Sequence, residues 1–195
     1  MRNCLVIDLD RCSGCDSCIV ACKLENNIDL GNYWNQVIAV GPTATHPDIE
    51  QYWLPVQCQQ CENAACVHVC PTGASYRDEK TGVVLIDKAK CIGCQYCMMA
   101  CPYGVRSFNQ KEKVVEKCTL CSHRTADGEG VPACVHNCCC GARLYGDLDD
   151  PSSDVAKAVA AASPDAVHHL PDPGSAKPAT VYLLSPKTAA WKELV

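Results

Sequence analysis

The spacing of the cysteines constrains this chain more than any other feature of its sequence. Cysteine occupies 19 of the 195 positions, and sixteen of these cysteines fall into four groups of four. Two groups have the spacing C-x2-C-x2-C-x3-C: Cys12, Cys15, Cys18 and Cys22, and Cys91, Cys94, Cys97 and Cys101. The other two groups are Cys58, Cys61, Cys66 and Cys70, and Cys118, Cys121, Cys134 and Cys138. Such a chain is either a disulfide scaffold or a metal protein.

A disulfide scaffold fits the rest of the sequence poorly. Such scaffolds are usually exported, whereas residues 1–8 read as the start of a strand, with no signal-peptide core and no twin arginine. By its own sequence the chain is therefore expected in the cytoplasm. An odd number of cysteines also prevents every thiol from pairing within the chain. These observations favour a metal protein.

Charge and hydropathy argue against two classes of partner. The formal net charge is −5, whereas nucleic-acid-binding domains usually carry a basic surface. No apolar run approaches the ~20 residues that a membrane-spanning helix needs. We therefore expect neither nucleic-acid binding nor a transmembrane segment in this chain.

The spacing within each group is typical of iron–sulfur ligation. In the C-x2-C-x2-C groups, three thiolates within seven residues can surround one face of an iron–sulfur cube. The fourth cysteine lies one helical turn further on, so it faces away from that cube, and in two-cluster ferredoxins it binds the other cluster. Proline often follows this fourth cysteine, as Pro71 and Pro102 do here.

Other metal sites explain the pattern less well. Zinc sites usually take two separated C-x2-C pairs, or cysteine mixed with histidine. A c-type haem needs C-x-x-C-H, and a Rieske centre needs two histidine ligands on one iron, which the sequence does not offer. His68, His123 and His136 follow cysteines by two residues, and we interpret them as groups near the surface or beside the ligands.

The order of the groups predicts an α+β fold made of two nested, ferredoxin-like, two-cluster lobes. Residues 56–108 would form an inner lobe inserted into an outer lobe of residues 1–55 and 109–150, which carries a hairpin insertion at 30–56. Residues 34–40 and 51–56 are the expected strands of that hairpin. Residues 151–195 are expected to form a helix at 154–162, capped by Ser152 or Ser153, and an extended tail with a strand at 180–184. The tail would lie on its own lobes or on a partner.

The exchange of fourth cysteines within each lobe predicts four ligand sets. We number them cluster 1 (Cys12, Cys15, Cys18, Cys138), cluster 2 (Cys58, Cys61, Cys66, Cys101), cluster 3 (Cys91, Cys94, Cys97, Cys70) and cluster 4 (Cys118, Cys121, Cys134, Cys22). Because metal binding then supplies folding free energy, the iron-free chain is expected to be largely unfolded. Cys4, Cys139 and Cys140 remain outside the sets, and Cys4 reads as a small buried hydrophobe in the first strand.

No residues are predicted to be catalytic. Every cluster has four thiolates available, so no iron is left open for substrate, and neither G-x-G-x-x-G nor the P-loop pattern occurs. The chain is thus expected to move single electrons. Arg106, Lys117 and Arg124 lie next to ligands and would raise cluster potentials if they pointed inward; ordinary surface ion pairs are the alternative.

Several stretches resemble one known family. The order of the four groups is similar to that of the electron-transfer subunits of the molybdenum or tungsten bis-pterin oxidoreductases, the dimethyl-sulfoxide-reductase superfamily. The length and Gly146-Asp147-Leu148-x-Asp150-Pro151 are similar to its polysulfide/thiosulfate-reductase-like branch. The other matching stretches are residues 21–26 (ACKLEN), 70–74 (CPTGA), 101–106 (CPYGVR), 117–124 (KCTLCSHR) and 132–135 (PACV).

This resemblance implies a non-catalytic subunit of an oxidoreductase complex in anaerobic respiration. Nitrate-reductase-type relatives have tryptophan where this chain has Cys94, so the comparison implies four [4Fe–4S] clusters. The family usually has proline after the last ligand of the fourth group; here Cys139 follows, and is the alternative to Cys138, which the spacing favours.

The resemblance also implies partners. A catalytic molybdopterin subunit would hold the molybdenum or tungsten bis-pterin guanine dinucleotide, and a membrane quinone-linked subunit or a soluble electron donor would exchange electrons at the other end. Such subunits are often exported folded with a signal-bearing partner. The alternatives are a free-standing polyferredoxin that serves soluble redox partners and a zinc-stabilised interaction module.

Overall fold

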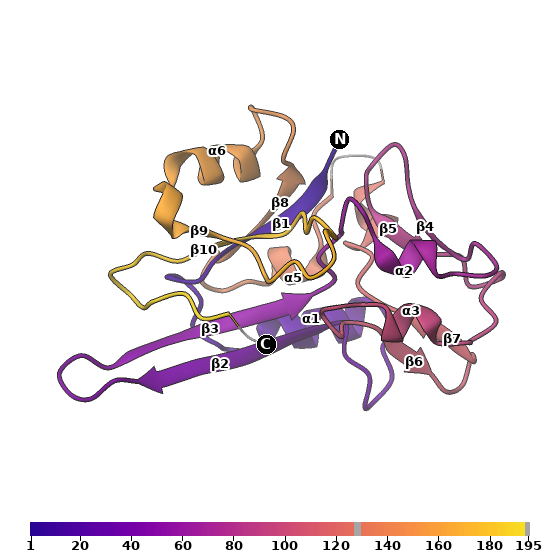
Figure 1. The fold of residues 1–195 in the computed structure, drawn as a ribbon, viewed down its shortest axis with the longest axis horizontal. Coiled ribbons are helices and arrows are strands. Elements are labelled where there is room, and N and C mark those ends of the chain that lie inside the picture. Colours follow the sequence, from indigo (N-terminus) through magenta and orange to yellow (C-terminus); the bar gives the residue numbers. More distant parts are fainter. Residues whose placement is uncertain (127–129, 194–195) are drawn as a thin grey trace.

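The first strand is the centre of a four-stranded sheet. The structure, a computed structural model, describes residues 1–126 and 130–193. Strand β1 (Asn3–Asp8) pairs antiparallel with β8 (Arg143–Asp147) and parallel with β10 (Val181–Leu183), and β10 pairs antiparallel with β9 (Val167–His168). The order is β8-β1-β10-β9, so residues close to both ends of the chain form the middle of one sheet (Figure 1).

Both faces of this sheet are covered. Because side chains alternate along a strand, Leu5 and Ile7 of β1 enter the main core while Val6 packs on the opposite side against Val155. Val155 belongs to α6 (Asp154–Ala161), the helix expected at 154–162. The Ser153 hydroxyl caps it by accepting a hydrogen bond from the backbone N–H of Ala156.

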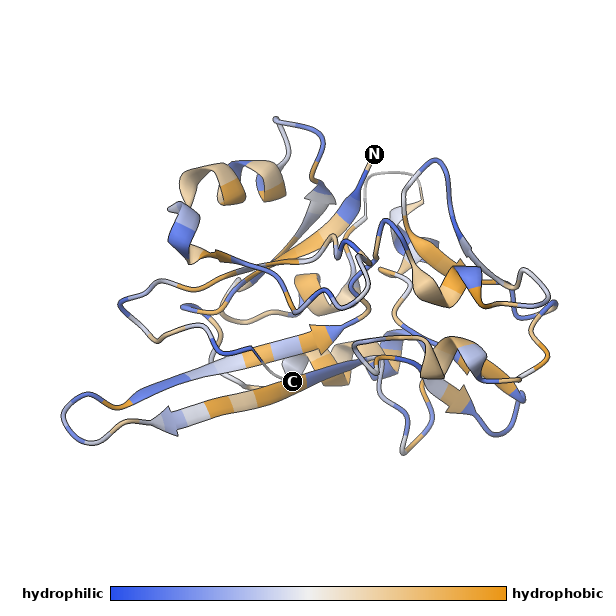
Figure 2. Cartoon of the chain, in the orientation of Figure 1, coloured by the Kyte–Doolittle hydropathy of each residue, from blue (hydrophilic) through white to orange (hydrophobic). Residues whose placement is uncertain are grey.

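A long hairpin extends from the body of the molecule (Figure 1). Its strands, β2 (Asn35–Thr43) and β3 (Glu50–Gln57), pair antiparallel in the region where a hairpin was expected. The hydrophobic residues concentrate in the part next to the body, and the end that points away is hydrophilic (Figure 2). The inner part can therefore cover other residues, as Tyr52 and Leu54 do in the main core.

The remaining elements are short and lie mainly on the other side of the molecule (Figure 1). Two small hairpins are formed by β4 (Ser75–Arg77) with β5 (Val84–Ile86) and by β6 (Ser107–Asn109) with β7 (Val114–Glu116). The remaining helical segments are α1 (Ser17–Glu25), α2 (Ala65–His68), α3 (Tyr96–Met99), α4 (Ser122–Thr125), α5 (Ala133–His136) and the 3-10 turn η1 (Pro164–Ala166). Helices of four residues are not stable by themselves in water, so packing or ligand binding must hold them.

The residues after α6 run back over the rest of the chain. The backbone N–H of Ala179 donates to the carbonyl of Gln59 at 2.9 Å, and that of Asn63 donates to Ala176 at 3.0 Å. Further on, the Trp191 ring stacks on His168, with ring centroids 4.7 Å apart. The strand expected at 180–184 is β10. These contacts make the C-terminal residues part of the same α+β body.

Membrane crossing is a separate question. None of the helices within residues 1–126 and 130–193 combines the length and apolar character needed to cross a bilayer.

Candidate metal centres

Four cavities in the structure are each lined by four expected ligands. We number the cavities after the clusters: cavity 1 (Cys12, Cys15, Cys18, Cys138), cavity 2 (Cys58, Cys61, Cys66, Cys101), cavity 3 (Cys70, Cys91, Cys94, Cys97) and cavity 4 (Cys22, Cys118, Cys121, Cys134). In each set the fourth cysteine comes from a distant part of the sequence. The fold therefore brings together the residues of all four expected sets.

Tight loops with left-handed backbone present the first cysteines of each C-x2-C-x2-C group. Gly14 has φ of 68° and Asp16 has φ of 60°, and Gly93 and Gln95 repeat this pair at 69° and 63°. A Cβ at Gly14 would collide with the Trp53 ring, so glycine is required there for space as well as for conformation. Each loop then enters a helix, α1 or α3, which carries the third cysteine in its first turn.

The sulfur atoms surround a space instead of converging on one point. Among the residues that the structure describes, no three His, Cys, Asp or Glu side chains gather closely enough to hold a single metal ion. An iron–sulfur cube needs this wider arrangement, because each thiolate binds a different iron atom. The donor set and its geometry thus fit a [4Fe–4S] cluster.

Buried cations between the cavities are a second sign of fit. Arg143 is 3% exposed and lines both cavity 1 and cavity 4; it donates to Asn35 Oδ1 at 2.9 Å. Lys117 is 1% exposed and donates to the backbone carbonyls of Val84 and Cys118. Neither forms an ion pair with a carboxylate in the described part of the chain, and a buried charge without a counter-ion is costly.

Arg106 is the third buried cation. It is 6% exposed, lines cavity 2, and donates from Nη2 to Ser75 Oγ at 3.1 Å. Burial alone would lower the pKa of its guanidinium, but negative charge at the neighbouring Cys66 and Cys58 outweighs burial and raises it. Anionic cysteine sets are the counter-ions that this cation needs.

The pKa of Arg143 shows the same balance. Burial would lower it, but the charges of Cys134 and Cys18, from two different cavities, raise it. Burial raises the pKa of the Cys22 and Cys61 thiols to about 12, so in the metal-free chain these two thiols are uncharged at neutral pH. Iron binds the thiolate form, so cluster binding supplies the negative charge that the buried cations lack.

Several buried hydrogen-bond donors also point to an acceptor in the inner cavities. Trp34 Nε1, Asn35 Nδ2 and Gln57 Nε2 belong to residues that line cavity 4, and none of the three atoms has a hydrogen-bond partner among the described residues. At cavity 2, Tyr103 Oη and Arg106 Nη1 also lack a hydrogen-bond partner among the described residues. Buried donors are nearly always satisfied in folded proteins. Sulfide and thiolate sulfur atoms of bound clusters are suitable acceptors, and such hydrogen bonds influence cluster potential.

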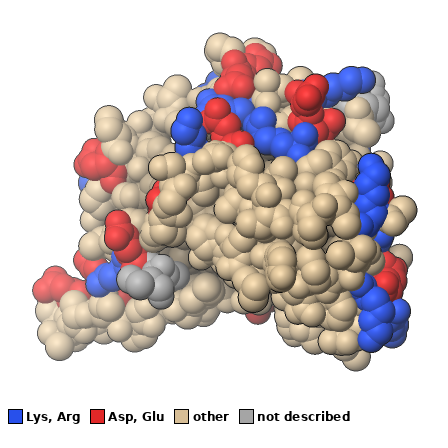
Figure 3. Space-filling model, turned by 45° about the vertical axis from the view of Figure 1, so that its right-hand side comes forward, with Lys and Arg blue, Asp and Glu red and all other residues tan. Residues whose placement is uncertain are grey.

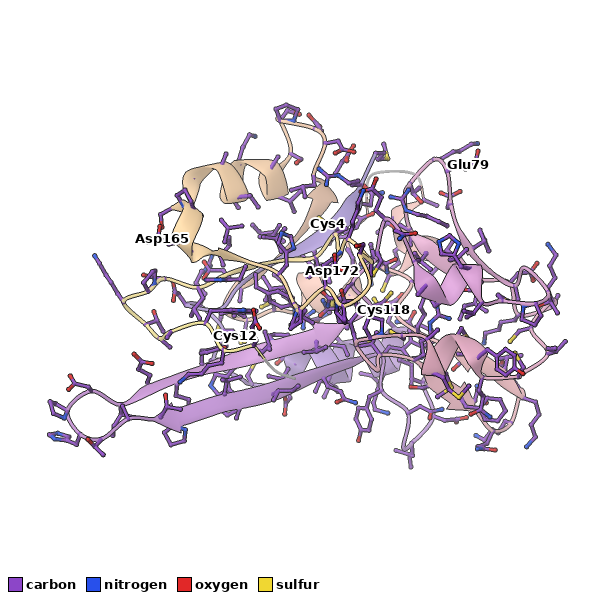
Figure 4. All side chains as sticks on the ribbon, in the orientation of Figure 1. Cys4, Cys12, Glu79, Cys118, Asp165 and Asp172 are labelled. Carbon is purple, nitrogen blue, oxygen red and sulfur yellow. The ribbon has the colours of Figure 1, made fainter. Side chains whose placement is uncertain are left out.

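The cavities are adjacent in the order 1, 4, 2, 3. Arg143 lies between cavities 1 and 4. Lys117 bonds to Cys118 of cavity 4 and to Val84, which lines cavity 2. Arg106 of cavity 2 bonds to Ser75, which lines cavity 3. Figure 4 labels Cys118 near the middle of the molecule and Cys12 closer to the long hairpin.

The cysteines of the two end cavities, 1 and 3, are more exposed to solvent than those of cavity 4. All four cysteines of cavity 4 are buried. By contrast, Cys15 of cavity 1 and Cys94 of cavity 3 are exposed, and a hydrogen bond with the Ser17 hydroxyl lowers the pKa of the Cys15 thiol to about 7. The two end cavities therefore reach the surface.

The structure also shows where Arg124, the three histidines and Cys4 lie. Arg124 forms an ion pair with Glu25 at 2.7 Å, so it has the surface role given above as the alternative. His68, His123 and His136 line none of the four cavities, in agreement with their interpretation as groups near the surface. Cys4 is fully buried in β1, and burial raises its pKa to about 12.

Cys138 lines cavity 1, whereas Cys139 does not. Sequence reasoning gave no signal for Arg143, Trp34 or Gln57, because these residues lie outside the cysteine groups and reach the cavities only through the fold.

Comparison with known proteins gives consistent results. Residues 49–148 match the family described as "4Fe-4S dicluster domain". The chain is 44% identical to a protein of Halobacterium salinarum provisionally named as an iron–sulfur subunit of dimethyl sulfoxide reductase, with 92% of this chain and 78% of that protein covered. It is 41% identical to a subunit of the sulfite dehydrogenase of Allochromatium vinosum, over 94% and 83%. It is 46% identical to the thiosulfate reductase electron transfer subunit of Salmonella typhi, over 73% and 74%.

Proposed function

Because this chain belongs to the ferredoxin-like iron–sulfur subunits of the molybdopterin oxidoreductases, we propose that it relays single electrons between a catalytic molybdopterin subunit and a second redox partner. The observation that carries this proposal is the series of four cysteine-lined cavities whose two ends reach the surface. The chain holds [4Fe–4S] clusters, and the substrate chemistry takes place in the catalytic subunit.

We assign the ligands of clusters 1 to 4 as the four cysteine sets that line cavities 1 to 4. Each set offers a thiolate to every iron of a cube. The buried cations Arg143, Lys117 and Arg106 would lie at the three junctions between neighbouring clusters. Electrons would then move in short steps along the order 1, 4, 2, 3, in either direction.

Two nested lobes are consistent with this series. Apart from Ala176, which also lines cavity 2, cavities 2 and 3 are lined by residues between 58 and 115, and cavities 1 and 4 by residues before 58 and after 117. We therefore propose the inner lobe at 56–108 and the outer lobe at 1–55 and 109–150. Residues 151–195 would stabilise the outer lobe through β10, which lies next to β1.

The ends of the series are suitable docking sites. Large hydrophobic side chains are exposed beside cavity 3: Ile92 at 67%, Tyr96 at 54% and Met99 at 79%. When the right-hand side of the molecule is turned forward, it presents a broad face without charged side chains, bordered by Lys, Arg, Asp and Glu (Figure 3). Exposed apolar areas of this kind often mark protein interfaces. The second partner would be a membrane quinone-linked subunit or a soluble electron donor, and an exported complex would depend on a signal-bearing partner.

Redox titration followed by electron paramagnetic resonance tests the proposal. The tagged chain, purified without oxygen, should show about four reducible [4Fe–4S] centres per chain. Gel filtration of the native complex should show the chain in stable association with a larger subunit. A chain that carries clusters but elutes alone at every protein concentration would contradict the assignment as a subunit.

A further inference from the structure

Cavity 1 differs from the other three because a fifth cysteine lines it. Cys140 contributes to its wall together with Cys12, Cys15, Cys18 and Cys138. Cavities 2, 3 and 4 are each lined by four cysteines within the part of the chain that the structure describes. The role of cluster 1 as an electron carrier does not require this additional thiol.

The additional thiol lies at the exposed side of the cavity, next to the ligand loop. The Cys140 thiol donates a hydrogen bond to Ser13 Oγ, with 3.3 Å between sulfur and oxygen. Ser13 lies in the loop that presents Cys15. The Cys139 sulfur lies between those of Cys15 and Cys140, 3.4 Å from Cys15 Sγ and 3.7 Å from Cys140 Sγ. Three sulfur atoms from two distant segments thus gather at the mouth of one cavity.

The backbone holds this arrangement in place. The N–H of Gly141 donates to the carbonyl of Cys138 at 3.0 Å, which closes a turn over residues 138–141. Gly141 has φ of 57°, a conformation that glycine adopts readily. The turn keeps Cys140 on the wall of the cavity, two residues after the proposed ligand Cys138.

We propose that Cys140 is a reserve ligand of cluster 1, able to bind the iron atom that Cys15 holds if the bond to Cys15 is lost. In this exchange the Fe–S bond to Cys15 breaks and the Cys15 thiolate takes up a proton from solvent, while the Cys140 thiol releases a proton to solvent and its sulfur forms the new Fe–S bond, without transfer of an electron. Cys15 is the exposed ligand of an end cluster, and exposed thiols are the most susceptible to modification. The inference rests on the ligand sets assigned under the proposed function.

Removal of Cys15 tests the proposal, and Cys94 supplies a matched control. Cys94 occupies the same position in an identical spacing and is also exposed, but no fifth cysteine lines its cavity in the described residues. In the anaerobically purified chain, Cys15→Ala should retain about sixteen iron atoms and show only [4Fe–4S] signals. Cys94→Ala should lose about one iron and show a [3Fe–4S] signal when oxidised.

Two double variants identify the thiol. Cys15→Ala with Cys140→Ala should show the [3Fe–4S] signal, whereas Cys15→Ala with Cys139→Ala should behave like Cys15→Ala alone. A [3Fe–4S] signal in Cys15→Ala, loss of the whole cluster, or an intact cluster after removal of both Cys15 and Cys140 would each overturn the inference.

Alkylation of the intact holoprotein by iodoacetamide, followed by mass spectrometry, gives an independent result. In Cys15→Ala the reaction rate of Cys140 should fall at least tenfold relative to the wild type, while Cys139 should still be alkylated. An unchanged rate at Cys140 would argue against the exchange. Wild-type protein without iron would instead contradict the proposed function itself.

Discussion

At the scale of single residues, we expect the buried cations to influence how easily each cluster accepts an electron. Arg143 contacts the walls of cavities 1 and 4, has no carboxylate partner among the described residues, and is 3% exposed. A positive charge stabilises the more negative, reduced form of a cluster. Its removal should therefore lower the reduction potentials of the nearby clusters.

We expect Arg143→Gln to lower the potentials of clusters 1 and 4 by several tens of millivolts. A unit charge ~10 Å away contributes about 1.7 kcal/mol at an effective dielectric constant of ~20. For one electron, ~59 mV corresponds to a tenfold change in the equilibrium constant, or about 1.4 kcal/mol. Arg124→Gln is the control, because Arg124 pairs with Glu25, and it should leave the potentials unchanged. Equal shifts in both variants would contradict the assigned role.

Single residues were only partly predictable from the sequence. The cysteines were readable because the cluster requires a local spacing, which the sequence displays directly. The roles of Arg143, Trp34 and Gln57 could not be predicted, because a cation or hydrogen-bond donor beside a cavity has no pattern in the sequence. Their positions depend on how β2, β3 and β8 fold around cavity 4.

At the scale of elements, the helices α2 to α5 are too short to be stable by themselves. Each has four residues, and each carries a cysteine or follows one directly. Their stability must come from tertiary contacts and from metal–thiolate bonds. Removal of iron should therefore remove their structure.

We expect the iron-free chain, prepared with a chelator under reducing conditions, to lose most of its far-UV circular dichroism. Reconstitution with iron and sulfide should restore the spectrum. Buried cations without thiolate counter-ions add to the destabilisation of the iron-free state. A native-like spectrum without metal would show that packing alone holds these elements.

A buried tyrosine in strand β10 allows the stability of the C-terminal residues to be tested. Tyr182 is fully buried; its hydroxyl donates to the carbonyl of Pro55 and accepts a hydrogen bond from Gln59 Nε2, each at 3.0 Å. Tyr182→Phe should lower the free energy of unfolding by about 1–3 kcal/mol, because two buried hydrogen bonds are lost and Gln59 Nε2 keeps only its bond to the Gln57 carbonyl.

The measurement is the urea concentration at which the visible absorbance of the clusters disappears. Tyr76→Phe, at a side chain that is 40% exposed, should shift this concentration little. Equal shifts in the two variants would show that the hydroxyl of Tyr182 contributes nothing specific.

Elements with local signals were predictable, and long-range pairings were not. The helix at 154–161 has its serine cap in the sequence, and the hairpin has two runs of strand-forming residues. By contrast, nothing local indicates that residues 181–183 pair parallel with β1. That pairing depends on the closure of the whole chain.

At the scale of the whole molecule, the chain is suited to relay electrons. Cavities 4 and 2 lie inside the series, cavities 1 and 3 reach the surface, and a buried cation lies at each junction. We propose that a redox partner binds at each end. The repeated spacing predicted an α+β fold and the four proposed ligand sets, whereas the order of the cavities follows only from the fold.

Elemental analysis tests the central claim most directly. The tagged chain would be purified without oxygen from its native host, together with whatever remains bound to it. We predict about sixteen iron atoms per chain, as four [4Fe–4S] clusters require, and about one molybdenum or tungsten atom in the co-purifying subunit. Iron in this amount without molybdenum or tungsten would contradict the partnership, and zinc in place of iron would contradict the assignment of iron–sulfur clusters altogether.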